Sequence, residues 1–334
     1  LFDTPVPERA VMAVMTSGTT GIPKILFRSF ESWADFFAIQ NAVFGVDADS
    51  RLFVQGSLAF TGNLNLYMGQ LAAGGTLIAE DVFLPGKWEQ VMARERANGI
   101  YLIPSKLLML PRVFKGVNAN IRTIISGSQS LGRKDAEVLK KIFPNTEITL
   151  YYGASELNYI TYVKSADMTE ERNLIGKPFP GVRVFIQDDE MYVDNAFHVE
   201  NITVPYSLKD SGRMDAQGNF YFLGRTDDIV GVRGRKVSMM KIENALEEVA
   251  GITEAAVVLL PKEKDADMPA EIVSAFVTVE GTDVPENLRQ QLKEKLADFE
   301  IPKRVIVLEA FPKNTSGKVD KARLKKMWIE QEPQ

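Results

Sequence analysis

The chain contains 334 residues, 45% hydrophobic and 25% charged, a composition typical of a folded protein of about two domains. Its 39 basic and 44 acidic residues give a net charge of −5, which argues against nucleic-acid binding as the main function. Cysteine is absent and His198 is the only histidine, so disulfides, thiolate nucleophiles and multi-histidine metal sites are excluded, and a reducing, cytoplasmic location is expected. Because no apolar run reaches about 18 residues, we predict no membrane span.

The first part of the chain alternates short apolar runs with longer amphipathic segments. Strands are predicted at 11–15, 52–54, 76–79, 100–103, 121–125 and 148–152, and helices at 88–97 and 133–142. Another helix is expected to begin near Ser32, because Ser32 and Asp35 have the spacing of a capping box. This alternation predicts a layered α/β domain.

The pattern changes near residue 181, where a segment rich in glycine and aspartate begins. Beyond it, helices are predicted at 241–249, 285–296 and 318–328, and strands at 255–260, 272–279 and 304–308. The fold class is therefore α/β, with a large N-terminal layered α/β domain over residues 1–226. A small C-terminal α+β domain over residues 227–334 is joined to it by a hinge.

The strongest local motif follows the first predicted strand. It consists of Thr16, Ser17, Gly18, Thr19, Thr20, Gly21 and, after Pro23, Lys24. Glycines allow backbone N–H groups to converge on an anion, while the hydroxyls and the lysine donate to phosphate oxygens. Since Pro23 precedes the lysine, this is not a Walker A loop, but it is predicted to bind phosphate.

Two further clusters follow predicted strands. One contains Tyr151, Tyr152, Gly153, Ala154, Ser155 and Glu156, and the other contains Gly127, Ser128 and Gln129. An aromatic ring can stack on a purine, and a glutamate can bind Mg²⁺. Ligands of open α/β sheets bind outside the carboxyl ends of strands, so we expect these clusters and the phosphate motif to share that edge.

Two later motifs are ambiguous when taken singly. Asp210 and Arg225 are suited to bracket a ribose, but a surface ion pair in a turn explains them equally well. Lys318 follows a Ser-Gly turn and is either an exposed helix cap or a mobile catalytic cation.

The order and spacing of these motifs resemble the adenylate-forming superfamily of acyl-CoA synthetases, peptide-synthetase adenylation domains and luciferases. The resemblance covers nearly the whole chain. Residues 16–24 match the phosphate loop, and 152–156 match the family's Tyr-Gly-x-Thr-Glu with Ser155 in place of threonine. Residues 224–234 match the hinge segment, and 312–318 match the loop that carries the C-terminal catalytic lysine.

The resemblance implies ATP, Mg²⁺ and either coenzyme A or the phosphopantetheine of a carrier protein as cofactors. Residues 16–24 would hold the β- and γ-phosphates, and residues 127–129 would line the adenine pocket with Tyr152 stacking. By the same resemblance, Ser155 and Glu156 lie near the α-phosphate and the metal, Asp210 and Arg225 hold the ribose, Asp227 is the hinge, and Lys318 bridges the substrate carboxylate and the α-phosphate. His198 matches no family motif and is expected to be structural.

The resemblance also indicates the acyl substrate. Residues 58–65 match the region beside the acyl pocket, which implies that Phe60, Thr61 and Asn63 contact the acid. Amino-acid-activating members carry an aspartate where Thr61 stands, so an aryl or fatty acid is favoured over an amino acid.

Three departures from the family pattern affect these expectations. Met239 and Lys241 stand where the family has a proline and a glutamate after the hinge, which bears on how the acyl acceptor docks. Leu208 and Lys209 stand where the family usually has Thr-Gly before the ribose-binding aspartate. The long segment that family members carry before the phosphate loop is missing, so we expect either a fragment of a longer chain or an unusually short member.

The sequence therefore predicts an acid–thiol ligase that adenylates a carboxylic acid and passes the acyl group to coenzyme A. Transfer to a carrier protein is the alternative within enzymes. A non-catalytic nucleotide-binding protein is the alternative from another class, although Lys318 and Glu156 argue against it because binding alone would need neither.

Overall fold

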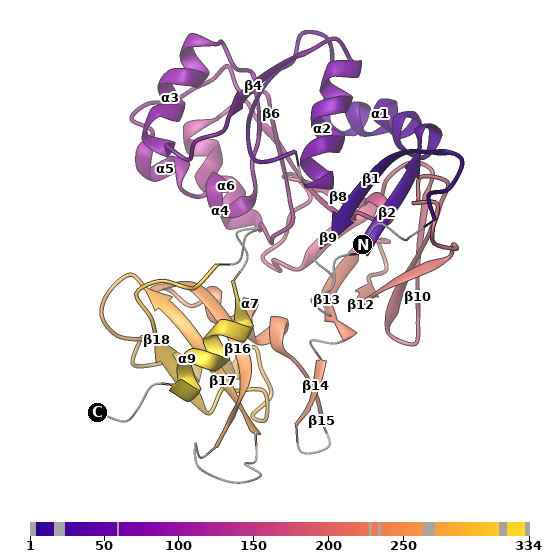
Figure 1. Ribbon diagram of the computed structural model, residues 1–334. Coiled ribbons are helices and arrows are strands. Elements are labelled where there is room, and N and C mark those ends of the chain that lie inside the picture. The colour runs from indigo at the N-terminus through magenta and orange to yellow at the C-terminus, as the bar shows by residue number, and fades with distance from the viewer. Residues whose placement is uncertain are drawn as a thin grey trace. The chain divides into compact units, whose positions relative to one another are not determined.

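The computed structural model describes residues 5–16, 24–58, 60–226, 229–232, 235–262, 271–313 and 319–330. The chain divides into two compact units (Figure 1). The first contains residues 1–208 and 212–222, and the second contains residues 209–211 and 223–334. The domain boundary predicted between residues 226 and 227 stays a prediction.

An eleven-stranded sheet runs through the described residues, in the order β10-β11-β12-β13-β9-β8-β7-β6-β5-β3-β4. Its parallel part consists of β3 (Arg51–Gln55), β4 (Thr76–Glu80), β5 (Gly99–Tyr101), β6 (Thr123–Gly127) and β7 (Glu147–Ala154). The remaining strands are β8 (Asn158–Lys164), β9 (Leu174–Pro178), β10 (Val182–Gln187), β11 (Glu190–Asn195), β12 (Tyr206–Met214) and β13 (Phe220–Arg225). The strands β7 to β9 pair antiparallel, so the sheet is mixed.

The parallel strands are buried on both faces because side chains alternate between two apolar clusters. Ile124 packs into one cluster and Ile125 into the other, as do Phe53 and Val54. The first cluster is covered by α3 (Pro85–Arg94), α5 (Leu110–Val113) and α6 (Arg133–Ile142), and the second by α1 (Phe30–Phe44) and α2 (Thr61–Ala72). Figure 1 shows the two helix groups on opposite sides of these strands, and the short α4 (Pro104–Leu107) follows β5. The predicted layered α/β class is confirmed.

The strand before the phosphate motif does not join this sheet. β1 (Ala10–Thr16) pairs antiparallel with β2 (Lys24–Ser29) as a separate two-stranded sheet, with Thr16 opposite Lys24. The expectation that the phosphate motif follows a strand of the large sheet is therefore wrong. Val11 and Met15 are 61% and 65% exposed, so one face of β1 lacks the burial that a strand of the parallel sheet requires.

The helices α1 and α2 also differ from the sequence-based expectation. The first begins at Phe30 rather than after Ser32, because Ser29 is its N-cap: the Ser32 N–H donates to the Ser29 hydroxyl at 3.2 Å. The helix α2 is not expected from the sequence, since its opening Thr-Gly-Asn-Leu-Asn has weak helix propensity. Tertiary packing of Leu66 and Tyr67, both buried, stabilises it instead.

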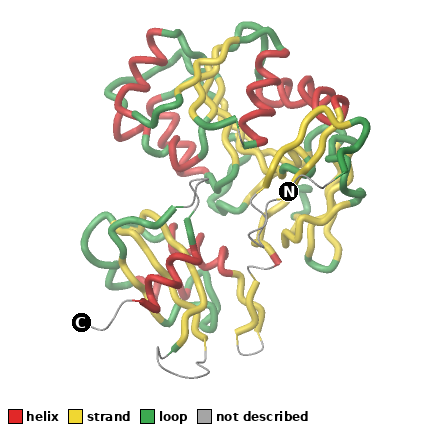
Figure 2. The backbone as a smooth tube through the Cα atoms, viewed as in Figure 1, coloured by secondary structure: helices red, strands yellow, loops and turns green. Residues whose placement is uncertain are grey.

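The second unit holds a three-stranded sheet of β16 (Ile252–Pro261), β17 (Glu271–Val279) and β18 (Arg304–Val307). Its helices are α7 (Met239–Glu247), α8 (Leu288–Lys293) and α9 (Lys321–Glu330), and β14 (Ile229–Val232) and β15 (Arg235–Ser238) form a hairpin (Figure 2). Val257 and Val258 point into apolar clusters on opposite faces of the sheet. The predicted α+β character of this unit is confirmed. In the described part of the chain, no helix combines the length and the apolar character that crossing a membrane requires.

Candidate functional site

The carboxyl ends of β6 and β7 bring two of the predicted clusters together. The two strands pair in parallel with Gly127 opposite Tyr151. A Cβ on Gly127 would lie 2.5 Å from Cζ of Tyr151, so only glycine fits under that ring. Ser128 follows in the left-handed region with φ of 70° and is exposed, and the side-chain oxygen of Gln129 accepts a hydrogen bond from the Ser105 N–H at 2.9 Å.

The two adjacent tyrosines of β7 have different surroundings. Tyr151 is buried, its hydroxyl lies 2.8 Å from that of Tyr101, and its ring centroid lies 4.4 Å from that of Tyr159. Burial raises the pKa of Tyr151 to about 12. Tyr152 is half-buried and packs beside Phe222 at 5.8 Å between centroids. The structure thus places Tyr151 in the core, while Tyr152 keeps exposed surface for a ligand.

The turn after β7 is fixed through three consecutive backbone carbonyls. The carbonyl of Ser155 accepts from Arg28 Nη2 at 2.8 Å, that of Glu156 accepts from the Val199 N–H at 2.9 Å, and that of Leu157 accepts from Asn195 Nδ2 at 3.0 Å. Each of the three carbonyls thus has a donor within the protein. The Ser155 and Glu156 side chains are therefore presented on a rigid backbone.

Residues 195–201, called the strap here, supply two of these donors and also bind β2. The Glu200 N–H donates to the Phe27 carbonyl at 2.7 Å, and Asn201 Nδ2 donates to the Ile25 carbonyl at 3.1 Å. His198 belongs to the strap, where its Nδ1 lies 2.7 Å from the Val199 carbonyl oxygen. This local contact agrees with the structural role expected for His198, which stays a prediction.

The predicted acyl-contacting residues lie at the start of α2. Phe60 is the N-cap residue and is 44% exposed, whereas Thr61 is buried and its Oγ1 lies 3.0 Å from Ser155 Oγ. Asn63 donates to the Ser57 carbonyl at 2.8 Å. The Thr61 contact joins the segment predicted to hold the acid to the turn predicted to hold the α-phosphate and the metal.

Sequence reasoning missed three groups around this turn. Arg28, Asn65 and Tyr159 are all nearly or fully buried. Asn65 accepts from Trp33 Nε1 at 2.6 Å and donates to Asn158 at 2.7 Å, and the Tyr159 hydroxyl donates to the Gly62 carbonyl at 3.0 Å. One feature of the sequence could have indicated a buried charge: Arg28 directly follows the apolar residues 25–27.

The structure also brings together the pair predicted to bind the ribose. Arg225 Nε lies 3.4 Å from Asp210 Oδ1, and the Asp210 carboxylate is largely buried. Lys209 has φ of 63°, in the region that favours glycine. Lys209 therefore keeps the left-handed backbone conformation that favours glycine, the residue that the family usually has at this position.

Several predicted residues lie outside the described residues. They are Ser17, Gly18, Thr19, Thr20, Gly21, Asp227 and Lys318. At the flanks of the phosphate motif, the backbone of Thr16 ends β1, and Lys24 begins β2 with an exposed side chain.

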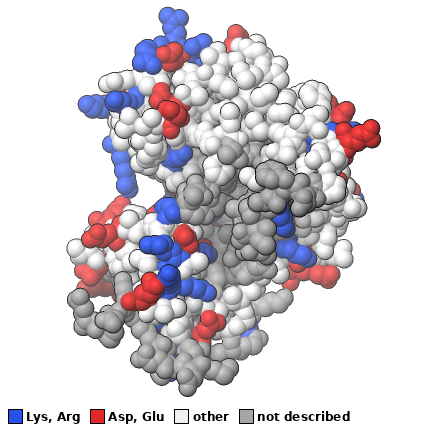
Figure 3. Space-filling model, viewed as in Figure 1, with Lys and Arg blue, Asp and Glu red and all other residues white. Residues whose placement is uncertain are grey.

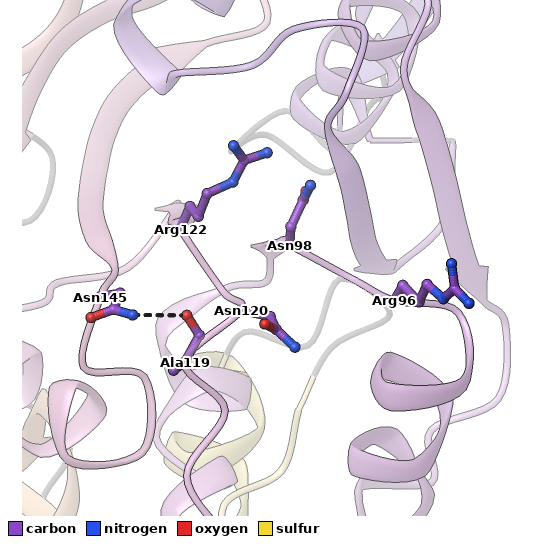
Figure 4. Close-up of a pocket in the computed structure, with 6 residues that line it drawn as sticks. All are labelled: Arg96, Asn98, Ala119, Asn120, Arg122 and Asn145. Atoms are coloured by element: carbon purple, nitrogen blue, oxygen red, sulfur yellow. Dashed lines mark hydrogen bonds between the residues drawn. The ribbon is translucent and has the colours of Figure 1, made fainter.

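An open hollow of about 750 Å³ lies at the amino ends of β5, β6 and β7, opposite to the predicted nucleotide residues. It is lined by Arg96, Asn98, Ala119, Asn120, Arg122 and Asn145 (Figure 4). Asn145 donates to the Ala119 carbonyl at 3.0 Å, and the two arginines point in different directions. Of the motif residues that the structure describes, none lines this hollow.

Charges of both signs are interspersed among the described residues on the face that Figure 3 shows. Within the described ranges, no three Asp, Glu or His side chains gather as a ready-made metal cage. A single carboxylate with adjacent hydroxyls suits Mg²⁺, which is commonly held by one or two carboxylates together with substrate phosphates. Glu156, half-buried beside Ser155, fits this donor set.

Comparison with known proteins gives consistent family matches. A family model described as AMP-binding enzyme matches residues 2–196, and a model described as AMP-binding enzyme C-terminal domain matches residues 241–318. An uncharacterized acyl–CoA ligase, YhfT of Bacillus subtilis, is 27% identical, with 98% of this chain and 70% of that protein covered. A linear gramicidin synthase of Brevibacillus parabrevis is also 27% identical, with 93% of this chain and 7% of that protein covered. The crystal structure of ATP-bound MatB from Rhodopseudomonas palustris has a TM-score of 0.81 at 23% identity, with 95% of this chain and 68% of that chain covered, and shows the same fold.

Proposed function

Because the chain belongs to the family of AMP-binding enzymes, we propose that it activates a carboxylic acid with ATP and transfers the acyl group to coenzyme A. The predicted family and enzyme class, an AMP-forming acid–thiol ligase, are confirmed by the two family matches and by relatives such as the acyl–CoA ligase of B. subtilis. The cytoplasmic location stays a prediction.

One observation carries the proposal for this chain's own residues. The 3.0 Å contact between Thr61 Oγ1 and Ser155 Oγ links the segment assigned to the acid with the turn assigned to the α-phosphate. Adenylation requires these two reactants side by side, since the acid's carboxylate attacks the α-phosphorus. Holding them in one geometry lowers the entropic part of the barrier.

The chemistry follows from the charges of the reactants. The ionised carboxylate forms a bond to the α-phosphorus, the bond to the β-phosphate oxygen breaks, and pyrophosphate leaves. No general base is needed, because a carboxylate is already ionised at neutral pH. Mg²⁺ bound at Glu156 would neutralise phosphate charge, and Lys24 and Lys318 would add positive charge. In the second half-reaction the thiol of coenzyme A attacks the acyl carbon and AMP leaves.

The acid proposed is an aryl or fatty acid rather than an amino acid. Thr61 offers no carboxylate for a substrate ammonium group, and burying that charge unpaired would cost at least a few kcal/mol. Discrimination on the order of 100-fold in kcat/KM is expected. Pyrophosphate exchange with matched acids, such as phenylalanine against 3-phenylpropanoate, tests this; a preference for the amino acid would overturn it.

Transfer to a carrier protein is the second candidate, favoured by the match of 93% of this chain to a segment of the gramicidin synthase. Acyl transfer from a pre-formed acyl-adenylate to coenzyme A or to a carrier phosphopantetheine separates the two. Lys318→Ala should abolish adenylation, measured by pyrophosphate exchange, but spare transfer from the pre-formed acyl-adenylate, because Lys318 is assigned to the first half-reaction only. Equal loss of both steps would contradict that assignment.

A further inference from the structure

Arg28 is a fully buried cation close to the proposed site. It lies in β2, four residues after Lys24, and is 0% exposed. Burial lowers the pKa of its guanidinium to about 10, which leaves it charged at neutral pH. Burying a charge costs free energy unless hydrogen bonds and an opposite charge compensate for it, so such a residue needs a structural or functional reason.

The guanidinium donates to backbone carbonyls of three separate segments. Its Nη2 contacts the Ser155 oxygen at 2.8 Å, and its Nη1 contacts the oxygens of Phe197 at 2.8 Å and of Ser32 at 3.2 Å. Its Nε has no hydrogen-bond partner among the described residues. Arg28 therefore joins the turn after β7, the strap and α1 through one rigid, planar group.

The charge of Arg28 also has an acidic partner in the turn. Glu156 is the acidic side chain whose charge raises the pKa of Arg28, opposing the effect of burial. The turn residue assigned to the metal therefore compensates the buried arginine. Arg28 thus binds the backbone of this turn, and the acidic side chain of the turn offsets its buried charge.

We propose that Arg28 is a positioning residue that holds the Ser155–Glu156 turn in place relative to the strand leaving the phosphate motif. This role rests on the proposed function. In this role Arg28 acts through the Ser155 carbonyl, which it binds directly, rather than as a ligand of substrate or metal. A displacement of about 1 Å at a site of this kind can cost about 100-fold in rate.

Arg28→Lys is the test, because it keeps the charge but not the fork of donors. The matched control is Arg51→Lys at the amino end of β3, where Arg51 Nε donates to the Glu95 carbonyl at 2.8 Å. Pyrophosphate exchange is measured for both variants at saturating ATP and across a magnesium titration, with thermal unfolding as the check of folding. We expect Arg28→Lys to lower kcat about 10- to 100-fold and to raise the half-maximal magnesium concentration. Arg51→Lys should leave both within about twofold.

The outcomes separate the two proposals. An active wild type with Arg28→Lys unchanged in kcat and magnesium dependence would overturn the positioning role alone. A wild type that exchanges no pyrophosphate with any acid would overturn the proposed function, and the positioning role with it. If Arg28→Lys does not fold, Asn195→Ala replaces it, since Asn195 Nδ2 holds the Leu157 carbonyl of the same turn. That variant should show the same two changes, and unchanged values would overturn the role.

Discussion

The two edges of the parallel strands β3, β5, β6 and β7 are built differently. At the carboxyl edge, Ser155, Glu156 and Leu157 have their carbonyls bound by Arg28 and by residues of the strap, and the Tyr101 and Tyr151 hydroxyls pair in the interior. At the amino edge, an open hollow is lined by exposed side chains such as Arg122.

The difference between the two edges indicates which of them carries the functional site. The open hollow contains two arginines, both exposed, and no buried charge among its lining residues. The carboxyl edge has buried polar groups such as Arg28 and Asn158 and a close approach at Gly127, whereas left-handed backbone occurs at both edges, at Ser128 and at Arg96. Such features cost stability and usually persist where function requires them, so the comparison favours the carboxyl edge as the place of the chemistry.

The largest expected effect on the rate of adenylation comes from replacing the carboxylate that follows β7, with the carboxylate at the start of β7 as the control. Glu156→Gln should lower the rate of adenylation by 100-fold or more, about 3 kcal/mol, because one metal ligand and the charge opposite Arg28 are both lost. Glu147→Gln at the amino end, where Glu147 accepts from Ser165 Oγ at 2.6 Å, should leave the rate within about twofold. Pyrophosphate exchange across a magnesium titration measures both. If Glu156→Gln leaves the magnesium titration unchanged, Glu156 is ruled out as a ligand of Mg²⁺.

Alkaline pH should lower the free energy of unfolding, because tyrosine hydroxyls are buried near the carboxyl edge. The pKa of Tyr151 is raised to about 12 by burial, so the folded state holds this proton to higher pH than the unfolded chain does. Its contribution to stability is complete below about pH 10 and is lost as the pH rises to about 12, a change of about 3 kcal/mol. Burial also raises the pKa of Tyr101 and Tyr159, which adds to the loss, whereas the lowered pKa of Arg28 acts in the opposite direction.

Urea unfolding between about pH 8 and pH 11 measures this dependence, with ultraviolet absorbance reporting tyrosine ionisation. Tyr151→Phe should weaken the loss of stability with pH. A wild type whose free energy of unfolding does not fall above about pH 10 would contradict the burial of the tyrosine hydroxyls.

The close approach at Gly127 predicts a smaller effect on stability. Gly127→Ala places a methyl group about 2.5 Å from the Tyr151 ring, which the Tyr101 hydroxyl holds in position. The free energy of unfolding should fall by about 1 to 3 kcal/mol. Gly86→Ala is the matched control, since a Cβ there meets nothing within 4 Å and alanine favours the helix. Equal stability of the two variants would show that the ring moves freely.

The smallest effect is expected at the amino edge. Replacing both Arg96 and Arg122 by glutamine should change the free energy of unfolding by no more than about 0.5 kcal/mol, because both side chains lie on the open surface of the hollow. Adenylation should stay within about twofold of the wild type. A larger loss of activity would place a functional group at the amino edge and contradict the assignment of the chemistry to the carboxyl edge.

Much of the fold is predictable because burial leaves a periodic pattern in the sequence. The strands β3, β4 and β7 and the helix α6 follow from apolar spacing or β-branched runs. The helix α2 and the strand β2 do not, since α2 opens with poor helix formers and β2 contains a buried arginine. Their formation depends on partners distant in the chain.

By itself, the sequence determined the class of the fold, the order of the motifs and, through that order, the family and its chemistry. These depend on local composition and spacing, which do not change on folding. Only the tertiary structure decided that β1 pairs outside the large sheet, that Tyr151 turns into the core, and that Arg28 reaches Ser155 from 127 residues away. Long-range hydrogen bonds leave no periodic signal, because one residue can meet its partner at any separation once the chain has folded.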